Sequence, residues 1–328
     1  MKEMKSFATQ SGSTDAAQHP RQMLDTAGLS KTEMERRREA EKKWEKADIS
    51  NDFIFYKVMT ENYDLCLKLA QIILPDLNIT ELKYANAQET VKESHDAKGV
   101  CLDIFVKDGF GRVIDIEMQV VSAKNLPKRS RYYQSAVDMT MLKAGESYSK
   151  LKCSYIIFIC LDDPFELNRK IYTFGDACYE VPELKLNSGA LKIFLNASGI
   201  AGEINGELDQ FLKYVNGEDI DNPADFIDRF QNAVFLGKQN SEWRREFMIA
   251  TMRDLEKIEE GREEGREEGR EEGIMLMAFR FASSKLKQGV QEDVIINEMV
   301  SFLSLDKNIA RTTLEKAKSK NNKADMTS

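Results

Sequence analysis

The sequence predicts an α/β fold with a mixed central sheet flanked by helices, followed by a helical C-terminal appendage. Two segments, 100–108 and 112–121, alternate apolar and polar residues on either side of a short glycine-containing turn, as paired strands do. Residues 153–161, CSYIIFICL, form a nearly continuous apolar run, which indicates a central strand covered on both faces. Apolar stripes at helical spacing lie before and after these strands.

The N-terminal part predicts a polar, disordered start and then helices. Residues 1–30 are polar, and the charge-dense segment 32–46 predicts an exposed helix. Ser50 or Asn51 can cap the next helix, whose apolar stripe continues to Pro75 with a break near Asn62. Asp52 falls at the start of this helix, where a carboxylate can either cap the helix or bind a metal.

The turn at Gly109-Phe110-Gly111 fixes which residues of the two strands face each other. A three-residue loop pairs Asp108 with Arg112, and glycine at its third position suits the left-handed backbone of this loop type. Counting back, Asp103 lies opposite Glu117, and the neighbouring pairs are Phe105 with Asp115 and Cys101 with Gln119. An even-length loop would place the two carboxylates on opposite faces.

Facing carboxylates are the candidate chemistry of this hairpin. Directly opposed Cβ atoms are about 4.5–5.5 Å apart, so Asp103 and Glu117 repel each other unless a positive group lies between them. Mg²⁺ meets this need, because it is commonly held by one or two carboxylates together with substrate phosphates. The alternative is a pair of solvent-exposed acids on an open sheet face.

The segments around this pair resemble the PD-(D/E)XK nuclease superfamily, and more narrowly the recombination-promoting nuclease or putative transposase family. The resemblance extends over roughly 48–273 and rests on an ordered set of segments: NDFIFYKVM (51–59), KGV followed by LD (98–103), DIEMQ (115–119), NLPKRSRYY (125–133), Gly145, Tyr148, IIFIC (156–160), WRRE (243–246) and the Gly-Arg-Glu-Glu repeats.

The resemblance implies a restriction-endonuclease-like core that cuts phosphodiester bonds with Mg²⁺. It implies that Asp103 and Glu117 are metal ligands, that the Met118 carbonyl is a further ligand, and that Gln119 occupies the position of the superfamily's lysine. Asp52 matches the family's early acid, and Arg129 its recurrent arginine. A neutral Gln119 can orient water or a phosphate oxygen, so positive charge would have to come from the metal, Arg129 or Lys128.

A basic helix is predicted directly after the hairpin, from Pro127 to Gly145. Arg129 and Tyr133 are one turn apart and share a face, where Tyr133 can stack on a base or pack in the core. A local basic cluster could meet phosphates or form a solvated face; it comprises Lys124, Lys128, Arg129 and Arg131.

Shorter elements complete the predicted sheet and its surroundings. Residues 79–91, 172–174 and 191–195 are expected to be strands, Asp162-Asp163-Pro164 a turn, and the chain from about residue 206 helical.

Composition excludes several other classes. The chain has 328 residues, 42% of them hydrophobic, and a net charge of −8, to which residues 259–272 contribute eight Glu and three Arg. Its five cysteines lack CxxC spacing and its two histidines, His19 and His95, argue against a His-rich zinc site. No apolar run reaches the roughly 20 residues of a membrane span, and the N-terminus lacks the apolar core of a signal peptide, so a cytoplasmic protein without membrane association is expected.

The C-terminal part predicts helices around a repetitive spacer. Glu and Arg at spacings of three or four support a helix over 259–273, whereas each glycine there costs about 1 kcal/mol relative to alanine. The expected organisation is an N-terminal extension (1–47), a nuclease-like domain (48–200), a helical extension (201–258), the repeat spacer (259–273) and a helical appendage (274–328). The appendage could mediate homo-oligomerisation.

These observations lead to one principal hypothesis and one alternative. The principal hypothesis is a Mg²⁺-dependent DNA endonuclease associated with recombination or mobile elements. The alternative is a catalytically degenerate member of the family that binds nucleic acid or a protein partner without cutting.

Overall fold

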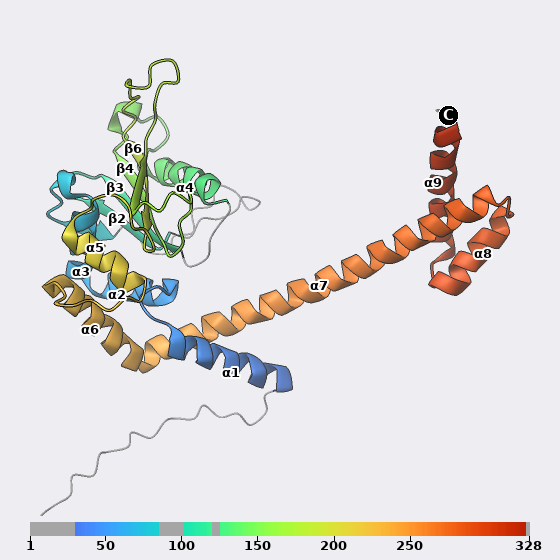
Figure 1. Ribbon diagram of the computed structural model, residues 1–328, viewed down its shortest axis with the longest axis horizontal. Helices are drawn as coiled ribbons and strands as arrows, with labels where there is room; N and C mark the ends of the chain where they lie inside the picture. Colours follow the sequence, from blue (N-terminus) through green and yellow to red (C-terminus); the bar gives the residue numbers. More distant parts are fainter. Residues whose placement is uncertain (1–29, 85–101, 120–124, 326–328) are drawn as a thin grey trace, which may run out of the picture.

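The computed structural model describes residues 30–84, 102–119 and 125–325, and its centre is a six-stranded mixed sheet with the order β1-β2-β3-β4-β6-β5 (Figure 1). The central pairs β3–β4 and β4–β6 are parallel, and the other neighbours are antiparallel. The strands are β1 (Leu82–Tyr84), β2 (Ile104–Asp108), β3 (Val113–Gln119), β4 (Ser154–Cys160), β5 (Ile171–Phe174) and β6 (Ala190–Asn196). Every residue of β4 is buried, as predicted for a central strand.

Helices cover both faces of this sheet and confirm the predicted mixed α/β fold. The main core lies on the face that packs against α2 (Asp52–Glu61), α3 (Tyr63–Ile73), α5 (Gly206–Val215) and α6 (Asp225–Gln239). A second core lies beneath α4 (Leu126–Met141) on the other face. Short 3₁₀ turns span Pro75–Leu77 and Tyr148–Lys150.

The predicted hairpin register is confirmed. The Asp108 amide donates to the Arg112 carbonyl at 3.0 Å, and the Gly111 amide donates to the Asp108 carbonyl at 2.9 Å. Gly111 has φ +78°, the left-handed conformation that this loop requires. The Asp108 side chain stabilises the turn further by accepting from the amides of Phe110 and Arg112.

Three local predictions need correction. The strand expected over 79–91 is β1 alone within the described residues, and its C-terminal part, 85–91, lies outside them. The helix after the hairpin ends at Met141 rather than Gly145, which instead lies in a turn with φ +84°. The helix expected to be exposed, α1 (Lys31–Lys46), buries Ala40 and Trp44 because it packs along α7.

The C-terminal part is dominated by α7 (Ser241–Lys287), a single helix of 47 residues that leaves the nuclease-like domain and ends beside α8 (Glu292–Leu303) and α9 (Lys307–Asp325) (Figure 1). The Gly-Arg-Glu-Glu repeats lie inside α7 without interrupting it. The end of α7, α8 and α9 share a small core of their own, which includes Ala278, Ile295, Met299 and Leu314. No helix of the described segments is both long enough and apolar enough to cross a membrane.

Gly237 allows α6 and α7 to meet, which gives a testable prediction. A Cβ atom at this position would overlap the ring of Trp243, which is 4% exposed and donates from Nε1 to Glu61 at 2.9 Å. We expect Gly237→Ala to lower the free energy of unfolding by about 1–3 kcal/mol, measured by urea denaturation. Gly265→Ala is the matched control, since nothing lies within 4 Å of its Cβ position, and a gain of up to about 1 kcal/mol is expected there. Equal effects of the two substitutions would contradict this role for Gly237.

Candidate metal and catalytic site

The candidate site lies where β2 begins and β3 ends. Ile104 pairs with Ile116 and Phe105 with Asp115, so the predicted register carries Asp103 to the position opposite Glu117. Asp103 itself precedes the first residue of β2, and Glu117 and Gln119 are among the last three residues of β3. Cys101, expected opposite Gln119, lies outside the described residues.

The two carboxylates are held by an exchange of hydrogen bonds between the strands. The Asp103 amide donates to Glu117 Oε1 at 2.8 Å, and the Met118 amide donates to Asp103 Oδ2 at 3.2 Å. Each carboxylate is therefore fixed by the backbone of the other strand. This arrangement orients both groups before any ligand binds.

Arg129 of α4 joins the two residues of β3 that the hairpin brings to the site. Its guanidinium donates to Gln119 Oε1 at 2.5 Å and to Glu117 Oε2 at 2.9 Å. It also donates to the Tyr133 hydroxyl at 2.7 Å and lies over the Phe158 ring, 5.6 Å from its centroid. The Arg129 guanidinium therefore contacts both Gln119 and Glu117.

Burial makes the charged forms of the carboxylates costly. It raises the pKa of Glu117 to about 8, with the charge of Asp103 as the next contribution, although Arg129 opposes the shift. It likewise raises the pKa of Asp103 to about 6, opposed by the hydrogen bond from Met118 and increased by the charge of Asp52. Because neither charge is fully compensated by the protein, the pair favours an additional cation.

Asp115 is a further buried acid that was not predicted as a site residue. It is fully buried, and no donor of the described residues hydrogen-bonds to either of its carboxylate oxygens. Burial raises its pKa well above the ordinary value, and the charges of Glu117 and Asp103 raise it further. The strand alternation was the available signal, because it places Asp115 on the same face as Glu117.

Asp52 lies on the same side of the molecule as Asp103. The side chain of Asn51 caps α2 by accepting from the Ile54 amide at 3.3 Å, while Asp52 is exposed and accepts from the adjacent Phe53 amide at 2.8 Å. An open groove of about 570 Å³ is lined by both Asp52 and Asp103. The helix α2 therefore contributes a carboxylate to the rim of the site.

Of the other residues predicted to contact DNA, some are exposed and one is buried. Lys128 and Arg131 are exposed on α4, whereas Tyr133 is 8% exposed and packs on Phe158 with ring centroids 5.9 Å apart. Of the two roles considered for Tyr133, stacking on a base or packing in the core, the structure shows packing. Its hydroxyl accepts from Arg129. Asp163 forms the predicted turn by accepting from the amides of Phe165 and Asn168. Lys124 and both histidines lie outside the described residues.

The site fits a hard divalent cation with few protein ligands. Within the described segments, no group of three or more His, Cys, Asp or Glu side chains is arranged to hold a metal, which excludes a structural zinc cage there. Mg²⁺ needs fewer, since it usually keeps several waters and takes one or two carboxylates. The Met118 amide points to Asp103, and the amide and carbonyl of a strand residue project toward the same edge, so the Met118 carbonyl is turned toward this side too.

Comparison with known proteins gives a family match for this domain. The family model described as PD-(D/E)XK nuclease family transposase matches residues 49–184, which include α2, the β2–β3 hairpin and α4. No curated protein and no solved structure matches the chain. Asp103, Glu117, Gln119 and Arg129 all lie within the matched residues. Residues 49–184 are therefore similar to the PD-(D/E)XK nuclease family transposases.

Proposed function

We propose that the protein is a Mg²⁺-dependent DNA endonuclease with its site at Asp103 and Glu117. The family match supports a nuclease associated with mobile elements, and PD-(D/E)XK nucleases generally use divalent metal ions. The observation that carries the proposal is the reciprocal fixation of two buried carboxylates, each of which accepts a backbone amide of the opposite strand. A pair of surface acids has no need of such fixed orientation. A metal site benefits from it, because the ligands are then oriented before substrate binds.

The carboxylates of Asp103 and Glu117, with the Met118 carbonyl, would hold Mg²⁺. When bound there, the ion would supply a Lewis acid for the phosphoryl oxygen and lower the pKa of a coordinated water. Asp103 and Glu117 keep their positions through the amides of Met118 and Asp103, so little reorganisation is needed. Asp52, which lines the same groove as Asp103, can accept a hydrogen bond from a water near the scissile phosphate.

Arg129 would supply the positive charge that Gln119 lacks. Its guanidinium contacts both Gln119 and Glu117, so a phosphate that reaches the site meets a fixed cation. Arg129 fixes the Gln119 side chain by donating to its Oε1, and an amide at this position can hydrogen-bond to a water or a phosphate oxygen. Lys128 and Arg131, exposed on the same helix, would bind flanking phosphates, and Tyr133 would hold Arg129 rather than touch DNA.

A degenerate member that binds DNA without cutting is the second candidate. The neutral Gln119 favours it, and so does the ion pair between Arg129 and Glu117, which partly neutralises one proposed metal ligand. A binding module would need the basic side chains of α4 but not the buried carboxylates.

Plasmid nicking and DNA binding distinguish the two candidates. The endonuclease should convert supercoiled plasmid to nicked or linear DNA with Mg²⁺ and leave it intact with EDTA. Binding that weakens across a salt series, with no cleavage at any Mg²⁺ concentration, would reject the enzyme and support the binding module.

We also propose that the C-terminal helices mediate homo-oligomerisation, as a unit separate from the nuclease-like domain. Their small core leaves large apolar side chains exposed, among them Phe302 (78%), Met277 (58%) and Leu276 (52%). Truncation after Glu260 should reduce the mass measured by light scattering to that of a monomer and leave plasmid cleavage intact. An unchanged oligomeric state would contradict this assignment.

A further inference from the structure

The groove beside Asp52 and Asp103 is built partly by helices outside the matched residues. One wall is the end of α1, with Lys43 and Lys46, and another is α7, with Ala250, Thr251 and Asp254. Residues of α2 form the wall next to the site carboxylates, including Phe53 and Tyr56. The family match begins at residue 49 and ends at 184, so the walls that α1 and α7 contribute lie outside the matched residues.

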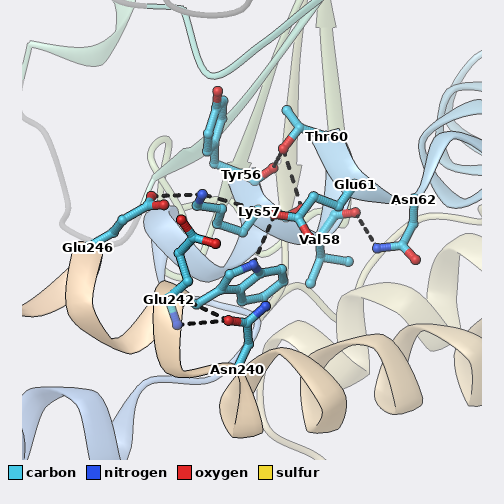
Figure 2. Close-up of polar contacts among 10 residues, drawn as sticks. Tyr56, Lys57, Val58, Thr60, Glu61, Asn62, Asn240, Glu242 and Glu246 are labelled. Carbon is cyan, nitrogen blue, oxygen red and sulfur yellow. Dashed lines mark hydrogen bonds and ion pairs between the residues drawn. The ribbon is translucent and has the colours of Figure 1, made fainter.

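Polar and aromatic contacts fix the walls of the groove to one another. Trp243 donates from Nε1 to Glu61 at 2.9 Å, and Lys57 forms an ion pair with Glu246 at 2.7 Å; the Lys57–Glu246 pair is drawn in Figure 2. These two contacts hold α7 against α2. Between α1 and α7, Arg36 pairs with Glu256 at 3.1 Å and Arg244 with Glu41 at 2.9 Å, and the Trp44 and Phe247 rings lie 5.2 Å apart. The groove is therefore a fixed feature of the fold.

The lysines of α1 are placed to bind an anion. Lys43 and Lys46 are exposed, and Lys43 makes only a long ion pair with Glu39, at 3.4 Å. Within the part of the chain that the structure describes, Lys46 makes no ion pair. Both line the groove that contains Asp52 and Asp103. In a nuclease, the anion that they would bind is a phosphate of the DNA backbone.

The size and lining of the groove favour unpaired nucleotides over a duplex. About 570 Å³ is within the usual range of small-molecule pockets and suits separate nucleotides. Phe53 and Tyr56 line the groove with half-buried rings, and a base would contact the apolar surface that remains beside the packing of Phe53 on Phe247 and Lys57. The carboxylates of Asp48 and Asp254 can accept from exocyclic amino groups. A paired base would present neither its face nor the full edge that these groups require.

We infer that this groove binds an unpaired stretch of the substrate strand next to the scissile phosphate, with Lys43 and Lys46 as its phosphate contacts. The inference rests on the proposed function, because Asp103 marks the cleavage point at one end of the groove. The preferred substrate is then DNA in which paired and unpaired segments meet, rather than a uniform duplex.

Binding by the full-length protein tests the inference without requiring cleavage. Fluorescence anisotropy in EDTA would compare a labelled short duplex with the same duplex carrying an unpaired arm. We expect at least about tenfold tighter binding of the armed DNA, a factor that one stacked base can supply. Removing both phosphate contacts in Lys43→Ala/Lys46→Ala should abolish this preference and reduce the salt slope of log K by about 1.4.

The matched control is Arg38→Ala/Lys42→Ala, which removes the same charge from exposed positions of α1 that do not line the groove. This control variant should still bind the DNA with the unpaired arm more tightly than the duplex. Circular dichroism should show that both double variants are folded. Equal affinity of the wild type for the two DNAs, or an equal loss in the two double variants, would overturn the inference. If the protein binds the DNA with the unpaired arm more tightly but shows no Mg²⁺-dependent cleavage, the proposed nuclease activity would be rejected. The assignment of the groove as a binding site for unpaired DNA would stand.

Discussion

Arg129→Ala should lower the rate of Mg²⁺-dependent cleavage by about 10²–10³-fold, the usual cost of removing one preorganised donor from a developing charge. Arg129 is the cation that contacts both Glu117 and Gln119. Its loss removes the guanidinium that donates to Gln119 and leaves the buried Glu117 carboxylate without this ion pair.

A second substitution makes this expectation specific. Gln119→Lys in the Arg129→Ala background returns a cation to the site and should recover a large part of the lost rate. In the wild-type background the same Gln119→Lys should not increase cleavage, because the introduced ammonium group would face the Arg129 guanidinium, which now donates to Gln119 at 2.5 Å.

Single-turnover cleavage of a labelled DNA measures all four proteins, with thermal unfolding as the check on the fold. Arg131→Ala is the comparison at saturating protein, since it removes an exposed arginine of the same helix that is assigned to DNA binding and not to the reacting centre. The account of Arg129 fails if Arg129→Ala cleaves at the wild-type rate, or if the rate falls equally in Arg131→Ala.

The stability of the metal-free protein should fall by on the order of a few kcal/mol as pH rises from about 5 to about 8. The pKa values of Asp103 and Glu117 are raised to about 6 and about 8, so in this range the folded state holds protons that the unfolded state has released. The unfolded state then binds fewer protons, and the free energy of unfolding decreases with pH. The raised pKa of Asp115 acts in the same direction.

Urea denaturation at a series of pH values measures this fall. Glu117→Gln should flatten the profile, because the amide does not titrate, and saturating Mg²⁺ should raise the stability of the wild type most at high pH. A wild-type profile that rises with pH across this range would contradict the described burial of the pair.

The hairpin was the most predictable part of the molecule, because its register depends on local geometry. A three-residue loop with glycine in the left-handed position leaves one pairing of Asp108 with Arg112, and every facing pair follows by counting. The central strand β4 was equally clear, since burial on both faces demands an unbroken apolar run.

The contacts that assemble the site were less predictable, because they join segments distant in sequence. The helical spacing of Arg129 and Tyr133 indicated a shared face but not that Arg129 would meet both Glu117 and Gln119. The walls formed by α1 and α7 depend on contacts such as Arg36 with Glu256, for which neither local sequence carries a signal. The glycines of the repeat predicted a weak helix, yet α7 continues through them without a break.

The central claim, that Asp103 and Glu117 form the catalytic metal site, is tested most directly by the cleavage rates of Asp103→Ala and Glu117→Ala. Wild type and variants would be compared under single-turnover conditions with Mg²⁺, with DNA affinity measured in EDTA and folding by circular dichroism. The account predicts that both folded variants keep their affinity for DNA and lose detectable cleavage. Cleavage by both variants at the wild-type rate would contradict it.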